Sequence, residues 1–343
     1  MKLNVLSLFN GKSCGYMALE DLGIECNYFA SEVDRYANKA AKAVNPNTVF
    51  LGNVTKIAYK NGILSNENTA YKTSIDILMF GSPCQGFSIM GKRLNLEDER
   101  SRLFFDAIRI LRSIQSENPD VLFLMENVKM DKKIQALISQ ELGISPILIC
   151  SSLVSAQSRG RLYWTNIGAT SSNLFGVKEC GIKQPKDRKI YLLDILETDV
   201  SEKHFLSEKT AMGVLKKGNR ASFDLKKSKC LSVGDLKCSQ SGSFILQRAH
   251  GFKDLSIFTD KAPTLMASKW QSNNFVAQKF EQDGYRMRRL TVSECMKLQT
   301  IPQKYIDILL SANISDSQLY KMCGNGWTIE VIKHIIKEVK WQK

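Results

Sequence analysis

The sequence lacks any apolar run long enough to cross a membrane, which takes about 20 consecutive residues. Its first apolar run, residues 3–9, breaks at Asn10-Gly11 and is too short for the core of a secretory signal peptide. Hydrophobic residues nevertheless make up 43% of the 343 residues. This content excludes a disordered chain and is sufficient for one large domain and a smaller one.

Metal-binding and disulfide patterns are also missing. The nine cysteines include no C-x-x-C pair, and the three histidines, His204, His250 and His334, are far apart in the sequence. We therefore expect no zinc site, and reduced thiols in the cytoplasm are a simpler interpretation than disulfides. A thiol-dependent hydrolase would also need a histidine near the motifs described below, and none is there.

Positive charge is abundant but unevenly distributed. The formal net charge is +14, and residues 203–304 hold 19 Lys and Arg against 8 Asp and Glu. A segment this basic indicates a polyanion partner, most simply nucleic acid, with a solubilising surface as the alternative.

The first half of the chain alternates short apolar segments with amphipathic ones. The predicted strands are 3–9, 27–32, 75–80, 121–125, 147–151 and 161–167, and the predicted helices are 13–22, 35–44, 103–114 and 132–142. This pattern predicts an α/β fold with a Rossmann-like, doubly wound and mostly parallel sheet. After about residue 184 the rhythm is lost, which indicates a second, smaller and β-rich domain before a final helix at 329–341.

Ligands of such sheets bind beyond the carboxyl ends of the strands. The first strand leads into Phe9-Asn10-Gly11-Lys12-Ser13-Cys14-Gly15, where two glycines allow the backbone to approach a ligand. This turn does not match the G-x-G-x-x-G dinucleotide fingerprint. The segment 86–92 is similar to a phosphate loop, but Arg93 stands where a Ser or Thr should bind magnesium. Glu32 ends the second strand, 21 positions past Gly11, where a carboxylate can accept ribose hydroxyls. The sequence thus favours an adenosine-bearing cofactor.

Three further groups follow later strands. Cys84 follows the strand at 75–80 on a proline turn and is a candidate nucleophile. Glu126 ends the next strand and, if protonated, could donate to a ring nitrogen of a substrate. Arg159 and Arg161 are two residues apart, so both can point to one face of a strand. Taken singly, the cysteine could be core, the glutamate a cap and the arginines a surface pair.

The order of these motifs resembles the cytosine-5 DNA methyltransferases. The matching segments are Pro83-Cys84-Gln85, Glu126-Asn127-Val128, Gln157-x-Arg159-x-Arg161, residues 288–295 and Gly324-Asn325-Gly326-Trp327. The resemblance covers about residues 3–167 and 286–341. The residues of the opening motifs are similar to those of the animal de novo branch of the family. The small size of the protein is typical of bacterial or phage enzymes.

The resemblance implies S-adenosylmethionine as the cofactor, with Glu32 on its ribose. The other residues implied to contact it are Phe9, Gly11, Val33, Asn53, Val54, Pro83, Leu103 and Asn325. It also implies that Cys84 attacks carbon 6 of a flipped cytosine, while Glu126 donates to nitrogen 3 and Arg161 holds the ring oxygen. Residues 85–100 would form a loop that closes over the base, with Gln85 and Ser88 contacting DNA.

Two residues depart from the family pattern. Lys12 is unfavourable near a cationic sulfonium unless it points to solvent or to the carboxylate of the cofactor. Asn53 stands where an Asp often accepts the adenine amino group, and its amide oxygen could accept with weaker charge assistance.

The resemblance also divides the chain. Residues 1–185 would form the catalytic domain, 186–317 the target-recognition domain, and 318–343 a C-terminal helix packing back on the catalytic domain. Arg220, Arg248 and Thr264 are expected to contact DNA, and Lys269 and Trp270 are further candidates. The expected partner is double-stranded DNA, with a cognate restriction nuclease as a further partner, and the expected state is a monomer in the cytoplasm. A tRNA cytosine-5 methyltransferase and a catalytically silent DNA-binding accessory are the alternatives.

Overall fold

A seven-stranded sheet forms the centre of the computed structural model, which describes residues 2–82, 99–172, 178–207, 244–248, 255–258, 261–265, 274–280 and 284–339. The strand order is β3-β2-β1-β7-β8-β11-β9. The bounds are β1 Leu3–Leu8, β2 Cys26–Ser31, β3 Val49–Gly52, β7 Ile77–Phe80, β8 Leu122–Val128, β9 Ile147–Cys150 and β11 Gly160–Thr165. Strands β3, β2, β1, β7 and β8 run parallel, while β11 is antiparallel to both β8 and β9. The predicted mostly parallel sheet is confirmed.

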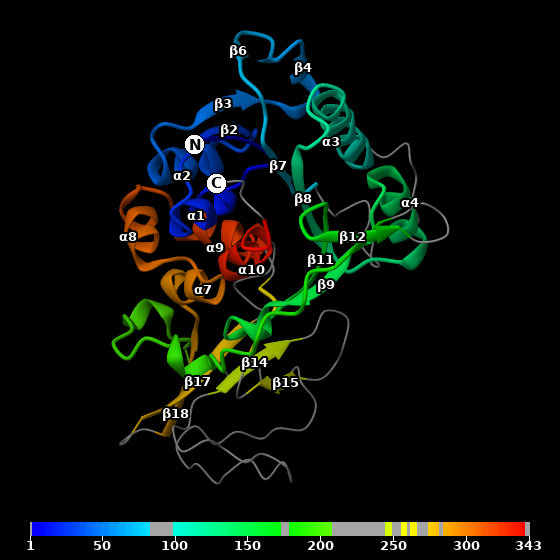
Figure 1. Ribbon diagram of the computed structural model, residues 1–343. Coiled ribbons are helices and arrows are strands. Elements are labelled where there is room, and N and C mark those ends of the chain that lie inside the picture. Colours follow the sequence, from blue (N-terminus) through cyan, green and yellow to red (C-terminus); the bar gives the residue numbers. More distant parts are fainter. Residues whose placement is uncertain are drawn as a thin grey trace.

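Helices cover both faces of this sheet (Figure 1). One face packs on α1 (Cys14–Asp21) and α2 (Arg35–Val44), and the other on α3 (Glu99–Gln115) and α4 (Lys132–Leu142). Successive side chains of a strand point to opposite faces, so β1 contributes Val5 to the first core and Leu6 to the second. The fold is therefore the expected doubly wound α/β arrangement.

The predicted bounds of α2 and α4 agree with the structure. The side chain of Asp34 accepts hydrogen bonds from the backbone N–H groups of Tyr36 and Ala37, and Asp131 caps α4 in the same way. Helix α4 ends at Gly143, which has a left-handed φ of 68°. Capping residues of this kind can be recognised in a sequence, so the bounds of both helices could be predicted.

Four helices near the C-terminus join the core on the α1 side: α7 (Val292–Leu298), α8 (Gln303–Ser311), α9 (Asp316–Asn325) and α10 (Ile329–Ile336). They lie beside α1 and α2 in Figure 1 although they are far away in the sequence. Helices α7 and α8 belong to the predicted recognition range 186–317, yet they share this core with α1. The division of the chain at 185 and 317 stays a prediction.

A separate antiparallel sheet has the strand order β15-β14-β17-β18. Its strands are β14 Phe244–Arg248, β15 Leu255–Phe258, β17 Asn274–Phe280 and β18 Gly284–Arg289. This agrees with the β-rich character expected after residue 184. No helix among the described residues is long and apolar enough to cross a membrane.

The remaining elements are short. Strands β4 Ala58–Lys60, β5 Ile63–Ser65 and β6 Ala70–Lys72 form a meander next to the 3-10 helix η1 Val54–Lys56. Strand β10 (Gln157–Ser158) pairs with β16 (Ala262–Pro263), and β12 (Ala169–Ser172) pairs with β13 (Lys178–Cys180). The 3-10 helices η3 Ser151–Leu153, η4 Leu192–Asp194 and η5 Glu202–His204 complete the described elements.

Candidate active site

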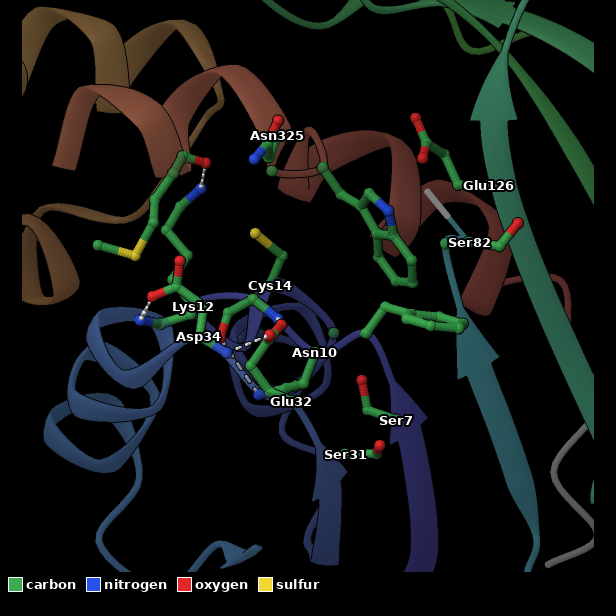
Figure 2. A pocket seen from close by; sticks show the side chains of 18 of the residues that line it. Ser7, Asn10, Lys12, Cys14, Ser31, Glu32, Asp34, Ser82, Glu126 and Asn325 are labelled. Atoms are coloured by element: carbon green, nitrogen blue, oxygen red, sulfur yellow. Dashed lines mark hydrogen bonds between the residues drawn. The ribbon is translucent and has the colours of Figure 1, made fainter. Parts of the chain in front are cut away.

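A cavity of about 520 Å³ lies beyond the carboxyl ends of β1 and β7. Strands β2 and β3 lie on one side of β1, and strands β7 and β8 lie on its other side. The strand order therefore reverses between β1 and β7. Ligands of open α/β sheets bind at such reversals, and the volume suits a molecule of cofactor size. Figure 2 shows Lys12 and Glu32 on one side of the cavity and Glu126 on the other.

Glu32 holds the turn that follows β1. Its Oε2 accepts the N–H of Gly11 at 2.9 Å, and its Oε1 accepts the N–H groups of Val33 and Asp34 at 2.8 and 2.9 Å. Phe9 in this turn has a φ of 55°, which is the left-handed region and is unusual for a residue with a side chain. A carboxylate oxygen has two lone pairs, so Oε2 keeps one for a ligand hydroxyl.

The other predicted cofactor residues within the described part of the chain line the same cavity: Phe9, Gly11, Val33, Asn53, Val54, Leu103 and Asn325. The side chain of Val33 is 72% exposed, an unusual state for an apolar residue beside a cavity. Asn53 accepts the N–H of Thr55 at 3.1 Å, so its amide oxygen has one lone pair left for the predicted adenine contact. Pro83 lies outside the described residues.

Glu126 and Arg161 form a pair on the neighbouring strands β8 and β11. Nε of Arg161 lies 3.0 Å from Oε1 of Glu126, and both residues line the cavity. The second oxygen, Oε2, would lie 3.4 Å from a Cβ built on Gly81, at the end of β7. A carboxylate and a guanidinium therefore line the cavity together, close to Gly81, which precedes Cys84 by three positions in the sequence.

Arg159 lines the same cavity but has other contacts than Arg161. It is buried, and its Nη2 donates to the carbonyl oxygens of Gly324 and Gly326, both at 3.1 Å. Burial and the charge of Arg161 lower the pKa of Arg159 to about 10, so it stays protonated at neutral pH. Both arginines line the cavity, but their contacts differ, because Arg159 binds backbone carbonyls and Arg161 binds Glu126. The catalytic roles expected for the two arginines stay predictions.

Lys12 takes an orientation that the sequence analysis did not anticipate. Only 1% of its surface is exposed, and its Nζ donates to the carbonyl oxygen of Met322 in α9 at 2.8 Å. The side chain thus avoids solvent by reaching a segment 310 residues away.

Several predicted site residues are not described. Cys84, Gln85, Ser88, Arg220, Lys269 and Trp270 lie outside the described residues, and Arg248 is described only as backbone of β14. The hydroxyl of Thr264 donates to the carbonyl oxygen of Ser158 at 3.1 Å. A hydroxyl has one proton to donate, so donation by the Thr264 hydroxyl to a DNA phosphate would require this bond to break.

Trp327 is a cavity residue for which the sequence analysis assigned no role. Its Nε1 would lie 3.1 Å from a Cβ built on Gly81, so the indole packs over the end of β7. The signal was present in the sequence, because Trp327 ends the motif Gly324-Asn325-Gly326-Trp327.

Known proteins resemble the chain over nearly its full length. The orphan methyltransferase M.SPRI of Bacillus phage SPR is 26% identical, and the match covers 98% of this chain and 97% of that protein. The Type II methyltransferase M.HhaI of Haemophilus parahaemolyticus is also 26% identical, with 97% and 93% covered. The crystal structure of a Spodoptera frugiperda DNMT2 mutant has the same fold, with a TM-score of 0.64, 21% identity and coverage of 98% and 99%.

The family model described as C-5 cytosine-specific DNA methylase matches residues 3–341. The family resemblance expected from the motifs is thereby confirmed. Because the match spans nearly all of the sequence, the chain belongs to the C-5 cytosine-specific DNA methylases, which transfer a methyl group to carbon 5 of cytosine.

Proposed function

We propose that the protein methylates carbon 5 of a flipped-out cytosine in double-stranded DNA, using S-adenosylmethionine and a covalent adduct with Cys84. One observation carries this proposal: a single cavity joins the Gly11–Glu32 turn to the Glu126–Arg161 pair. The first suits an adenosine-bearing cofactor and the second suits a pyrimidine ring. A methyl donor and its acceptor would thus share one enclosed space.

The residues present fit the proposed cofactor. Oε2 of Glu32 has a lone pair for a ribose hydroxyl, and the exposed side chain of Val33 offers an apolar surface for an adenine ring. When bound, S-adenosylmethionine supplies an electrophilic methyl group on a sulfonium. Phe9, Gly11, Asn53, Val54, Pro83, Leu103 and Asn325 are the further residues proposed to hold it.

The base side of the cavity supports cytosine as the acceptor. The target base has to leave the duplex, because its ring carbons are inaccessible within the base stack. In our proposal Glu126 donates to ring nitrogen 3 and Arg161 holds the ring oxygen. Within the described residues, Nη1 of Arg161 donates to the carbonyl of Gly160 and Nη2 has no hydrogen-bond partner, which leaves a donor for the base.

The chemistry proposed for Cys84 rests on the family resemblance. This residue lies outside the described part of the chain. Its thiolate would form a bond to carbon 6. The ring electrons displaced by this attack would be stabilised by the proton that Glu126 donates to nitrogen 3. Carbon 5 would then be an enamine-like nucleophile that takes the methyl group, while the electron pair of the broken S–CH3 bond stays on sulfur and S-adenosylhomocysteine leaves. Loss of the carbon 5 proton to solvent and cleavage of the bond to sulfur restore aromaticity.

DNA binding is proposed for the basic region. Gln85, Ser88, Arg220, Arg248 and Thr264 remain the proposed DNA contacts, and 186–317 remains the proposed recognition domain between the catalytic part, 1–185, and the C-terminal part, 318–343. A cognate nuclease, a monomeric state and a cytoplasmic location also stay predictions.

A trapped adduct tests the covalent route. Duplex DNA of mixed sequence, made with 5-fluoro-2′-deoxycytidine, cannot lose a proton from carbon 5 after methyl transfer. We expect a protein–DNA adduct that survives denaturing electrophoresis with the wild type and S-adenosylmethionine, and none with Cys84→Ser. The matched control is Cys150→Ser, which changes a partly buried thiol on β9 and should form the adduct normally. An adduct that persists in Cys84→Ser would refute the assignment of the nucleophile.

The two alternative functions predict different results, one in a competition experiment and one in the trapping experiment. A tRNA cytosine-5 methyltransferase would lose methyl transfer to DNA when tRNA competes. A catalytically silent accessory would bind DNA but form no adduct. The paired Glu126 and Arg161 argue for retained catalysis.

A further inference from the structure

Lys12 carries a buried positive charge that forms no ion pair with any described residue. Its single hydrogen bond among the described residues is to the neutral carbonyl of Met322, and it forms no ion pair with any of them. An ammonium has three donors, so two remain. Burying a charge without a partner of opposite sign is costly, and such charges are normally paired.

The protein groups around the ammonium do not neutralise it. Asp34 is paired with Lys321 at 2.9 Å, and the carboxylate of Glu32 accepts three backbone N–H groups. The nearby thiol of Cys323 is neutral at physiological pH, because burial raises its pKa to about 11. Within the described residues, no carboxylate therefore forms an ion pair with the ammonium of Lys12.

Lys12 also borders the cavity. Lys12 lines it together with Asn325 and Gly326, on the side of the Glu32 turn (Figure 2). A Cβ on Gly326 would overlap Nζ of Lys12, so the glycine provides the space that the ammonium occupies. The missing counter-charge can thus come from a ligand in the cavity.

We propose that Lys12 binds the carboxylate of the amino-acid moiety of S-adenosylmethionine. The inference rests on the cofactor named under the proposed function, and it concerns a residue at which this chain departs from the family pattern. Charge-assisted hydrogen bonds between an ammonium and a carboxylate are among the strong ones, especially out of water. The competing explanation is that Lys12 only caps the carbonyl end of α9, which cations also stabilise.

Two ligands separate these explanations. S-Adenosylhomocysteine contains the carboxylate, whereas 5′-methylthioadenosine lacks the whole amino-acid group but keeps the adenosine. We expect Lys12→Met to weaken binding of S-adenosylhomocysteine about 10- to 100-fold, the effect of losing a hydrogen bond to a charged group. Binding of 5′-methylthioadenosine should change less than about threefold, which also reports that the cofactor site is folded. Calorimetry or competition binding measures both affinities without turnover.

A second variant tests the role of the bond to Met322. Lys12→Gln keeps a donor for the carbonyl but removes the charge, so its affinity for S-adenosylhomocysteine should be as low as that of Lys12→Met. The matched control is Lys39→Met, which removes an exposed lysine that also donates to a backbone carbonyl, that of Asn313, and should leave both affinities unchanged.

The outcomes are distinct. Equal losses for the two ligands, recovery in Lys12→Gln, or unchanged affinity in Lys12→Met would each overturn the carboxylate assignment. A wild-type protein that binds neither ligand would instead refute the proposed cofactor itself.

Discussion

Replacing Glu126 by Gln is expected to lower kcat for methyl transfer by about 10²- to 10⁴-fold, the range for loss of a general acid. Glutamine has nearly the same shape and can still donate a hydrogen bond, but it cannot pass a proton to ring nitrogen 3. The change also removes the negative partner of Arg161, whose Nε lies 3.0 Å from the carboxylate. Affinity for S-adenosylhomocysteine should stay within about threefold, because Glu126 lies on the base side of the cavity and not at the Glu32 turn.

Steady-state transfer of labelled methyl groups to duplex DNA measures this effect on kcat. Glu67→Gln is the control, since it removes a carboxylate that is 61% exposed and paired with Lys56 on the surface. A kcat for Glu126→Gln close to that of the control would show that Glu126 takes no part in activating the base.

Replacing Arg288 by Met is expected to lower the free energy of unfolding by about 3–5 kcal/mol, because it leaves a buried carboxylate without its partner. Both residues of the Arg288–Glu294 pair are fully buried, and two hydrogen bonds of 2.8 Å join them. The same carboxylate accepts the N–H of Thr291 at 2.7 Å and completes the capping box at the start of α7. The pair therefore fixes β18, the outer strand of the small sheet, to the C-terminal helices.

Urea denaturation followed by circular dichroism measures this loss. The control is Lys203→Met, which breaks an exposed pair with Asp316 and should cost less than about 1 kcal/mol. Similar unfolding midpoints for the two variants would contradict the structural role of the Arg288–Glu294 pair.

The elements predicted best from the sequence are those with local signals. Helices α2 and α4 have capping residues and strong periodicity, and the strands of the central sheet are short apolar runs. The family motifs then identified the residues that line the cavity. Such features depend on neighbours in the chain, so a single sequence contains them.

The contacts that could not be predicted join distant segments. Lys12 reaches Met322, and Arg159 reaches Gly324 and Gly326, because α9 folds back against the end of the sheet. A two-residue spacing gives no information on such partners, so it could not separate the roles of Arg159 and Arg161. Helices α7 and α8 similarly lie in the range that the family resemblance assigned to DNA recognition, while their apolar faces pack on the central core.

Nucleoside analysis of the product shows directly whether the protein transfers a methyl group to carbon 5 of cytosine in duplex DNA. Unmethylated duplex DNA of mixed sequence, or tRNA, is incubated with the protein and S-adenosylmethionine, digested to nucleosides and examined by mass spectrometry. We expect 5-methyl-2′-deoxycytidine from DNA with the wild type and none with Cys84→Ser. Methylation of an exocyclic amino group, product formed only in tRNA, or undiminished product with Cys84→Ser would contradict this expectation.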